Sequence, residues 1–85
     1  MTKGELAKLT ADLPERFADR LSASDLDGLR SMAGGGEWDE LLDLLIAALQ
    51  QEQTQISRHE RDLLREVLTG WGMPTGLLDG LNVVD

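Results

Sequence analysis

Four carboxylates near the middle of the chain, Glu37, Asp39, Glu40 and Asp43, have the spacing best suited to chemistry with another molecule. At roughly 100° per residue, Asp39 and Asp43 lie one helical turn apart, with Glu40 beside them. Such a face could hold a metal ion or bind a cluster of arginines and lysines, and a solvated helix face is the alternative. Like charges at this spacing destabilise a helix by roughly 0.2–0.5 kcal/mol per pair. Because no basic residue of the same helix compensates, the repulsion favours a partner-binding role.

Asp25 and Asp27 form a second, smaller group of acids, which we expect to act as a secondary partner-binding patch. With Gly28 after them, they match the start of a calcium-binding loop in part. The third ligand and the closing glutamate are absent at the required spacing, so we predict no calcium site.

The remaining reactive side chains do not form a catalytic or metal-binding set. His59 is followed by Glu60, but the zinc motif needs a second histidine four positions after the first, where this chain has Leu63. Ser57 is better explained as a helix cap than as a nucleophile. The absence of cysteine excludes disulfides, thiolate metal sites and thiol nucleophiles. We therefore predict that the protein is not an enzyme and uses no catalytic residue, metal or cofactor.

Three successive glycines at residues 34–36 invite comparison with a phosphate-binding loop. Acids follow them at once, and no lysine or arginine lies between Arg30 and Arg58, so a phosphate group would meet only repulsion. We expect a helix stop or a hinge at this point.

Arg58, Arg61 and Arg65 form a basic stripe at helical spacing. Asp62 and Glu66 are interspersed with these arginines. This arrangement favours ion pairs within the protein over binding of an acidic ligand or nucleic acid.

Composition limits the class of protein further. The chain has 85 residues, enough for one small domain that needs most of its apolar residues for a single core. Its 16 acids and 8 bases give a formal net charge of -8, which repels phosphate backbones and anionic membranes and attracts a basic partner. Residues 1–6 lack the apolar stretch of a secretion signal, and no apolar run approaches the roughly 20 residues that span a bilayer. We expect a cytoplasmic protein that binds neither nucleic acid nor membranes.

Apolar spacing and helix-breaking residues predict the elements that position the acids. A first helix is expected to be interrupted at Pro14, and a second, short helix around Phe17 follows it. Ser24 is expected to cap a third helix, which stops at the glycines of residues 34–36. The acidic helix then runs from about residue 37 to 53, and its broad apolar arc is typical of the central helix of a bundle.

Ser57 and Glu60 fit a capping box that starts the next helix. Thr75 is expected to cap a last short turn. No segment alternates apolar and polar residues as a strand does, so we predict no sheet. The predicted fold of residues 1–85 is all-α, a single small bundle of four to six short helices. Its core is expected to form around the following residues: Leu42, Leu45, Leu49, Leu64, Val67 and Trp71.

The order of these features resembles the MafI family of small immunity proteins and, more loosely, other helical immunity proteins of contact-dependent inhibition systems. The resemblance covers about residues 22–81. The matching segments are the glycine-glutamate turn Gly36-Glu37, the leucine-rich helix at residues 41–49 and the isoleucine-serine cap Ile56-Ser57. The triple glycine and the polar run at residues 50–55, which lacks an aromatic residue, depart from the family pattern.

This resemblance implies a cytoplasmic protein that binds and blocks a cognate toxin domain, commonly a nuclease. The negative charge of the acidic surface fits that role, because nucleases use positively charged grooves to bind nucleic acid. An acidic regulatory adaptor that binds a basic host protein is the alternative. A carrier protein is a further rival, but Ser24-Asp25-Leu26 reverses the Asp-Ser-Leu order of a carrier attachment site.

Overall fold

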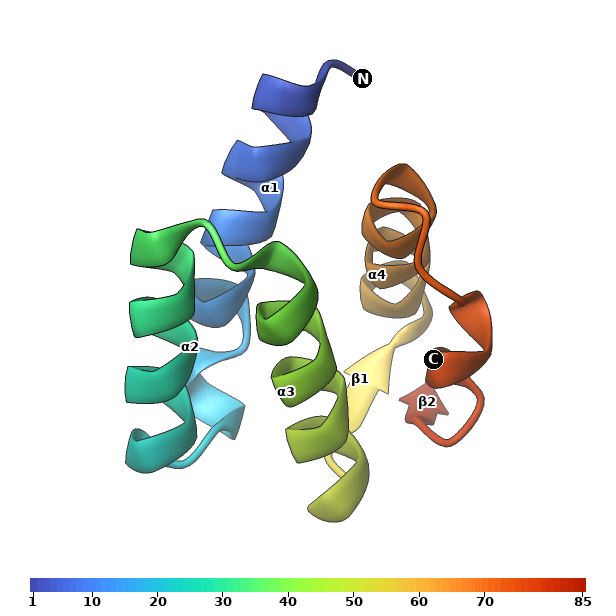
Figure 1. Cartoon of the computed structure of the whole chain (residues 1–85). Coiled ribbons are helices and arrows are strands. Elements are labelled where there is room, and N and C mark those ends of the chain that lie inside the picture. The colour runs from blue at the N-terminus through green and yellow to red at the C-terminus, as the bar shows by residue number, and fades with distance from the viewer.

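The computed structural model describes all 85 residues, which form four α-helices and a two-stranded sheet (Figure 1). The helices are α1 (Lys3–Arg16), α2 (Ala23–Gly35), α3 (Trp38–Gln51) and α4 (Arg58–Gly70). Two short 3-10 turns, η1 (Ala18–Arg20) and η2 (Thr75–Leu78), and two strands, β1 (Gln55–Ser57) and β2 (Asn82–Val84), complete the chain. The prediction of a small, mostly helical fold is confirmed, with four helices rather than a range of four to six.

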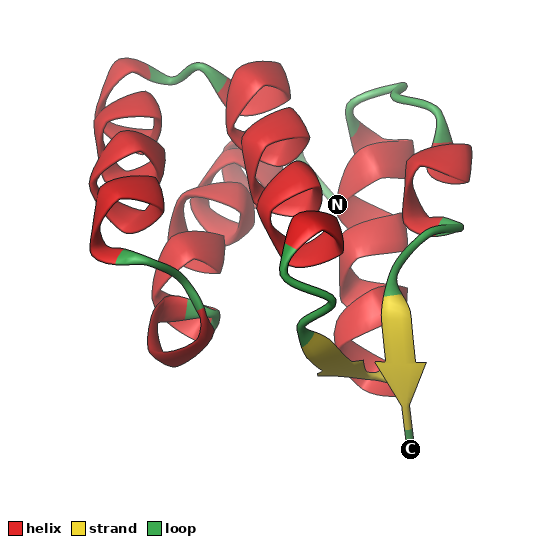
Figure 2. Ribbon diagram, turned by 90° about the horizontal axis from the view of Figure 1, so that it is seen from below, coloured by secondary structure: helices red, strands yellow, loops and turns green.

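The prediction that the fold is purely all-α is wrong, because the chain also forms the two short strands β1 and β2 (Figure 2), and these pair in parallel. Ile56 is aligned with Val83 in this pair. Parallel strands need a long crossover between them, and α4 together with η2 supplies it. Each strand has three residues, too few for alternation of buried and exposed side chains to be visible in the sequence.

The core is built mainly on α3, as its broad apolar arc predicts. Its buried residues are Leu41, Leu42, Leu45, Ile46, Ala48 and Leu49. Helix α1 lies against all three of the other helices and adds buried leucines at both of its ends. Five of the predicted core residues are fully buried, namely Leu42, Leu45, Leu49, Leu64 and Val67. The prediction is wrong for Trp71, which is only partly buried and packs against the edge of the core.

Pro14 does not interrupt the first helix as predicted. Helix α1 continues to Arg16, and Pro14 is buried in its last turn. A proline in a helix forfeits the hydrogen bond to the carbonyl four residues earlier, here that of Thr10. Because Pro14 lies close to the helix end, few backbone hydrogen bonds of α1 follow the one that is lost. The expected second helix is reduced to η1, and Phe17 just before it is fully buried.

Two predicted caps are wrong. Ser22, rather than Ser24, caps α2, and its hydroxyl accepts a hydrogen bond from the Asp25 amide at 3.1 Å. Pro74, rather than Thr75, precedes η2, and no side chain caps that turn. Serines two positions apart are equivalent cap candidates in sequence, so only the path of the chain out of η1 distinguishes them.

Only the last of the three glycines between α2 and α3 ends a helix. The first two belong to α2, whereas Gly36 adopts a left-handed conformation with φ of 69°. The Gly36 amide donates to the Ala33 carbonyl at 3.3 Å, and the Glu37 amide donates to the Met32 carbonyl at 3.0 Å. This is the Schellman pattern of helix termination, and it turns the chain directly into α3.

An ion pair joins the start of α4 to η1. Arg20 Nη1 donates to Glu60 Oε1 at 2.9 Å and to the Gln55 carbonyl at 3.2 Å. Glu60 also completes the predicted capping box, which is confirmed: the Ser57 amide donates to Glu60 Oε1 at 2.8 Å and the Glu60 amide to Ser57 Oγ at 3.0 Å. One carboxylate therefore caps α4 and fixes β1 and α4 to the segment that follows α1.

The hydrogen bonds from Arg20 lower the pKa of Glu60 from its ordinary value of 4.5 to about 2, although partial burial acts in the opposite direction. The charged form of Glu60 is thus favoured in the folded protein. Its contribution to stability is present above pH 4.5 and is lost as the pH falls toward 2.

We predict that alanine at two of the glycines has opposite effects. Gly34 is helical, and no atom lies within 4 Å of an added Cβ, so Gly34→Ala should raise the free energy of unfolding by about 0.5–1 kcal/mol. Gly36→Ala should lower it by about 1–2 kcal/mol, because its positive φ disfavours a side chain. Urea unfolding of the two variants measures both changes, and effects of the same sign would contradict this account of the turn.

We predict that Glu60→Gln lowers the free energy of unfolding by about 1–3 kcal/mol near neutral pH. Glutamine preserves the capping box but loses the charge that pairs with Arg20. The difference from the unmodified protein should shrink as the pH falls from 4.5 toward 2. Urea unfolding across this pH range is the measurement. Glu66→Gln on the same helix is the control and should change stability little, since Glu66 is exposed and unpaired.

Candidate functional site

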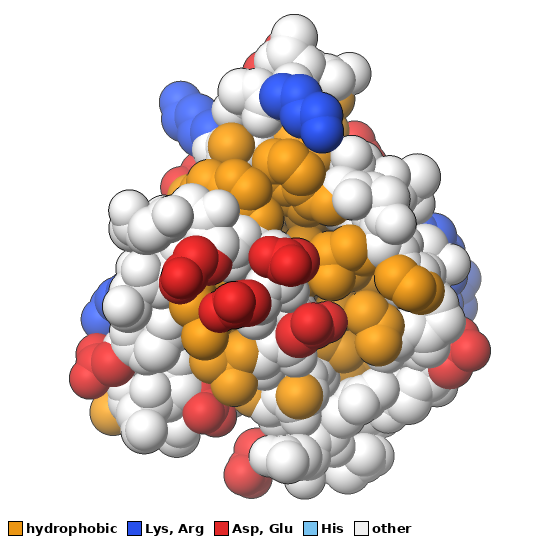
Figure 3. Space-filling view, viewed as in Figure 1, with side chains coloured by type: hydrophobic (Ala, Val, Ile, Leu, Met, Phe, Trp, Pro, Cys, Tyr) orange, Lys and Arg blue, Asp and Glu red, His pale blue; other side chains and the backbone are white.

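The four acids that the sequence singles out lie together at the start of α3. Glu37 is the residue before the helix, Asp39 and Glu40 occupy its first turn, and Asp43 follows one turn after Asp39. All four are exposed. Figure 3 shows acidic side chains gathered over this part of the molecule among hydrophobic ones, with basic side chains toward the top and the sides. We call these four residues the acidic face.

None of the four carboxylates of the acidic face makes an ion pair or a side-chain hydrogen bond. The arginines are used elsewhere: all except Arg16 pair with acids outside this face. The basic stripe on α4 follows the predicted pattern, because Arg61 and Arg65 both contact Asp62, at 3.2 and 3.5 Å. The acidic face is therefore a concentration of negative charge without internal compensation.

Asp25 and Asp27 do not extend the acidic face. They lie in the first half of α2, which runs toward the start of α3, so the two groups are at opposite ends of the α2–α3 pair (Figure 1). Arg30 lies near them on the same helix. The pKa of Arg30 is raised mainly by its hydrogen bonds to Glu15 and, to a lesser degree, by the charge of Asp27. The proposed secondary patch is thus separate from the main one and is partly balanced by an arginine.

Two tryptophans border the acidic face, Trp38 and Trp71, and the sequence analysis assigned Trp71 to the core. The rings of Trp38 and Trp71 stack with centroids 6.1 Å apart and planes 17° from parallel. Trp71 Nε1 donates to Thr10 Oγ1 at 2.9 Å, and this hydroxyl donates to the Leu6 carbonyl at 2.7 Å. Lys3 Nζ lies over the Trp71 ring, 5.2 Å from its centroid. The stack joins the start of α3 to the end of α4, and both rings remain partly exposed.

A hollow of about 280 Å³ opens beside this stack, and we call it the tryptophan hollow. It is lined by Gly36, Trp38, Asp39, Trp71 and Met73. Asp39 thus belongs both to the acidic face and to the hollow. The sequence signal for this site is that each tryptophan stands next to a helix terminus marked by glycine, where a large side chain has fewer neighbours to cover it.

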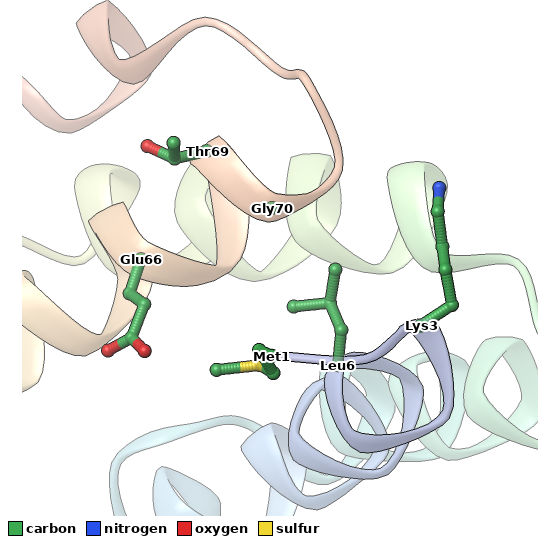
Figure 4. A pocket seen from close by; sticks show the side chains of 6 residues that line it. All are labelled: Met1, Lys3, Leu6, Glu66, Thr69 and Gly70. Carbon is green, nitrogen blue, oxygen red and sulfur yellow. The ribbon is translucent and has the colours of Figure 1, made fainter.

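A second hollow of about 280 Å³ lies between the first turn of α1 and the end of α4. Its lining residues are Met1, Lys3, Leu6, Glu66, Thr69 and Gly70. Figure 4 shows Lys3 and Glu66 on opposite sides of it. A Cβ added at Gly70 would lie 2.7 Å from Leu6 Cδ2, so the Leu6 side chain would have to shift to make room for it. The hollow combines single charges of opposite sign and carries no arrangement of catalytic groups.

The other residues considered for chemistry have structural positions. Ser57 caps α4, and His59 is exposed in the first turn of that helix. No group of three or more histidine, aspartate or glutamate side chains converges in a metal-binding arrangement. None of the helices combines the length and apolar character needed to cross a bilayer.

We predict that the repulsion between Asp39 and Asp43 opposes folding. Asp43→Asn removes repulsion with Asp39 and should raise the melting temperature by about 1–3 °C at low salt. Asp12→Asn is the matched control on α1. It removes a carboxylate that has Lys8 and Arg16 one turn away on either side, so it should lower the melting temperature slightly. Both shifts should diminish as salt is added. A loss of stability in Asp43→Asn would mean that this acid has a structural role.

No family model, curated protein or solved structure matches the chain. The resemblance to the MafI family therefore stays a prediction.

Proposed function

We propose that this protein is an immunity protein that binds a cognate bacterial toxin domain, a nuclease, and neutralises it through the acidic face of α3. The binding is stoichiometric and involves no chemical step. It takes place in the cytoplasm, where such a toxin meets its nucleic acid substrate.

The observation that carries this proposal is the lack of any internal partner for the acidic face. Its carboxylates take part in no ion pair, although the chain has six arginines and five of them pair with other acids. Uncompensated like charges on one helix weaken folding. A basic partner would remove that penalty, since its arginines and lysines would supply the missing counter-charges.

A nuclease fits as the partner because it must itself bind a polyanion. Its substrate groove presents positive charge to phosphate groups, and the acidic face would compete for the same charges. Electrostatic attraction accelerates the encounter of two such proteins. The partly exposed rings of Trp38 and Trp71 supply the apolar, aromatic contacts that usually determine how slowly a complex dissociates.

The first test is bacterial growth with the toxin candidate encoded immediately upstream. Its C-terminal domain is induced with and without this protein, and we expect toxicity that co-expression relieves. A neighbour that is harmless, or that stays toxic in the presence of this protein, would contradict the proposal and favour the alternative of a regulatory adaptor for a basic host protein.

We predict that the triple variant Asp39→Asn, Glu40→Gln, Asp43→Asn loses protection and binds the toxin about 10- to 100-fold more weakly. The dissociation constant should also become less dependent on salt concentration. The matched control is Asp12→Asn, Glu52→Gln, Asp79→Asn, which removes the same charge from exposed acids outside the face. If both variants protect equally well, the acidic face is not the interface.

A further inference from the structure

We propose that the tryptophan hollow receives an arginine side chain of the partner, which stacks on the indole rings and pairs with Asp39. This inference deepens the proposed function, since it rests on a basic protein as the ligand of the acidic face. The tryptophan hollow is the point of that face where a single partner residue is held.

The hollow is a fixed feature of the fold because it lies between two helix-terminating turns. Gly36 ends α2 in a left-handed conformation, and Gly72, with φ of 72°, does the same after α4. In the second turn the Gly72 amide donates to the Thr69 carbonyl at 3.1 Å and the Met73 amide to the Leu68 carbonyl at 2.9 Å. This repeats the Schellman pattern of the first turn. The first turn leads into Trp38 and Asp39, the second lies between Trp71 and Met73, and all four residues line the hollow.

The orientation of Trp71 is set by the protein interior. Its indole N–H is satisfied by Thr10 at 2.9 Å, and Thr10 is itself fully buried. Rotation of the ring to follow a ligand would break this hydrogen bond, so the bond with Thr10 holds the ring in place. Trp38 stacks on this fixed ring. The aromatic surface is in place before a partner arrives, so little conformational entropy is lost when a side chain binds to it.

The chemistry of the lining matches a guanidinium group. Arginine is planar, stacks on aromatic faces and pairs with a carboxylate through parallel hydrogen bonds. The hollow offers two indoles, a methionine and the unpaired carboxylate of Asp39. Lysine would gain the charge attraction but not the planar stacking, so arginine is the better fit.

The size of the hollow suits one side chain. At about 280 Å³ it falls just below the range of roughly 300–1,000 Å³ that holds drug-sized ligands. A cofactor or nucleotide would not be enclosed. A long side chain projecting from a partner's surface would fill the space.

One cation of the protein itself already lies against this aromatic surface. Lys3 Nζ lies 5.2 Å from the centroid of the Trp71 ring, although no carboxylate pairs with this ammonium group. The Lys3 side chain borders the other hollow, between α1 and α4, and not the tryptophan hollow. No lysine or arginine lines the tryptophan hollow, so the carboxylate of Asp39 is left for a partner.

The test is an NMR titration of the protein alone with a short glycine-serine peptide that carries one arginine. The chain has two tryptophans and hence two indole N–H signals, which report directly on the hollow. We expect both signals to shift, with a dissociation constant on the order of millimolar. The same peptide with citrulline, which has the shape of arginine without its charge, should leave them in place. Indole signals that do not move with the arginine peptide, or that move equally with citrulline, would overturn the proposal.

Two charge-matched variants distinguish binding in the hollow from a general attraction to the negative charge of the acidic face. Asp39→Asn and Glu40→Gln each remove one negative charge from the first turn of α3, but only Asp39 lines the hollow. We expect Asp39→Asn to weaken the arginine peptide about fivefold or more and Glu40→Gln about twofold or less. Equal weakening would mean that the peptide responds to net charge alone and would overturn the assignment to the hollow.

This titration uses no toxin, so its outcome is independent of the growth test. Failure of the peptide to bind would remove the hollow as an arginine site and leave the acidic face as the proposed interface. Failure of the growth test with a positive titration would leave an arginine-binding hollow on a protein with a different basic partner.

Discussion

Burial of the apolar arc of α3 is the constraint on which the rest of the structure depends. Six of its residues are buried, more than in any other helix. Each fully buried leucine stabilises the fold by roughly 1.5–3 kcal/mol, and no single neighbouring helix can cover an arc this wide. Helices α1 and α2 pack directly against α3, and α4 adds Leu64, Val67 and Leu68 to the same core. The surface of α3 that remains is narrow and carries the acidic residues.

The position of α4 is held by polar contacts at its first turn and by aromatic contacts at its end. At the start, Glu60 caps the helix and pairs with Arg20, which also binds the β1 backbone. At the end, Trp71 donates to Thr10 of α1 and stacks on Trp38 of α3. The parallel pairing of β1 and β2 then closes the segment that contains α4. These contacts fix the end of α4 relative to the start of α3, and this relation creates the tryptophan hollow.

The acids of this protein fall into two groups: those that pair with an arginine, and those that remain free to bind another molecule. Glu15, Glu60, Asp62 and Asp85 each pair with an arginine. The acidic face has no such partners, although it lies on the helix that contributes most to the core. Its carboxylates repel one another across a single turn. This cost to folding is offset by the helix dipole, which favours Asp39 and Glu40 in the first turn, and by the burial on the opposite side of the same helix. The combination of a rigid scaffold, exposed carboxylates and partly exposed aromatic rings suits a surface that binds another protein.

The sequence by itself determined those features that rest on contacts between near neighbours. The capping box of Ser57 and Glu60 and the acidic face of α3 span only one or two helical turns, and the pairing of Arg61 and Arg65 with Asp62 does too. The broad apolar arc of α3 likewise predicted its burial, because helical periodicity alone places those residues on one side.

Tertiary structure decided everything that depends on residues far apart in the chain. Pro14 remains helical because its buried position in the last turn of α1 outweighs one lost hydrogen bond, and the short strands form because the path of α4 and η2 returns Val83 to Ile56. Trp38 and Trp71 carry the same apolar signal as core residues, and only the meeting of two helix ends leaves them partly exposed around a hollow. Local periodicity reports which side of a helix is apolar. It does not report whether another element covers that side at the helix end, where neighbours are fewest.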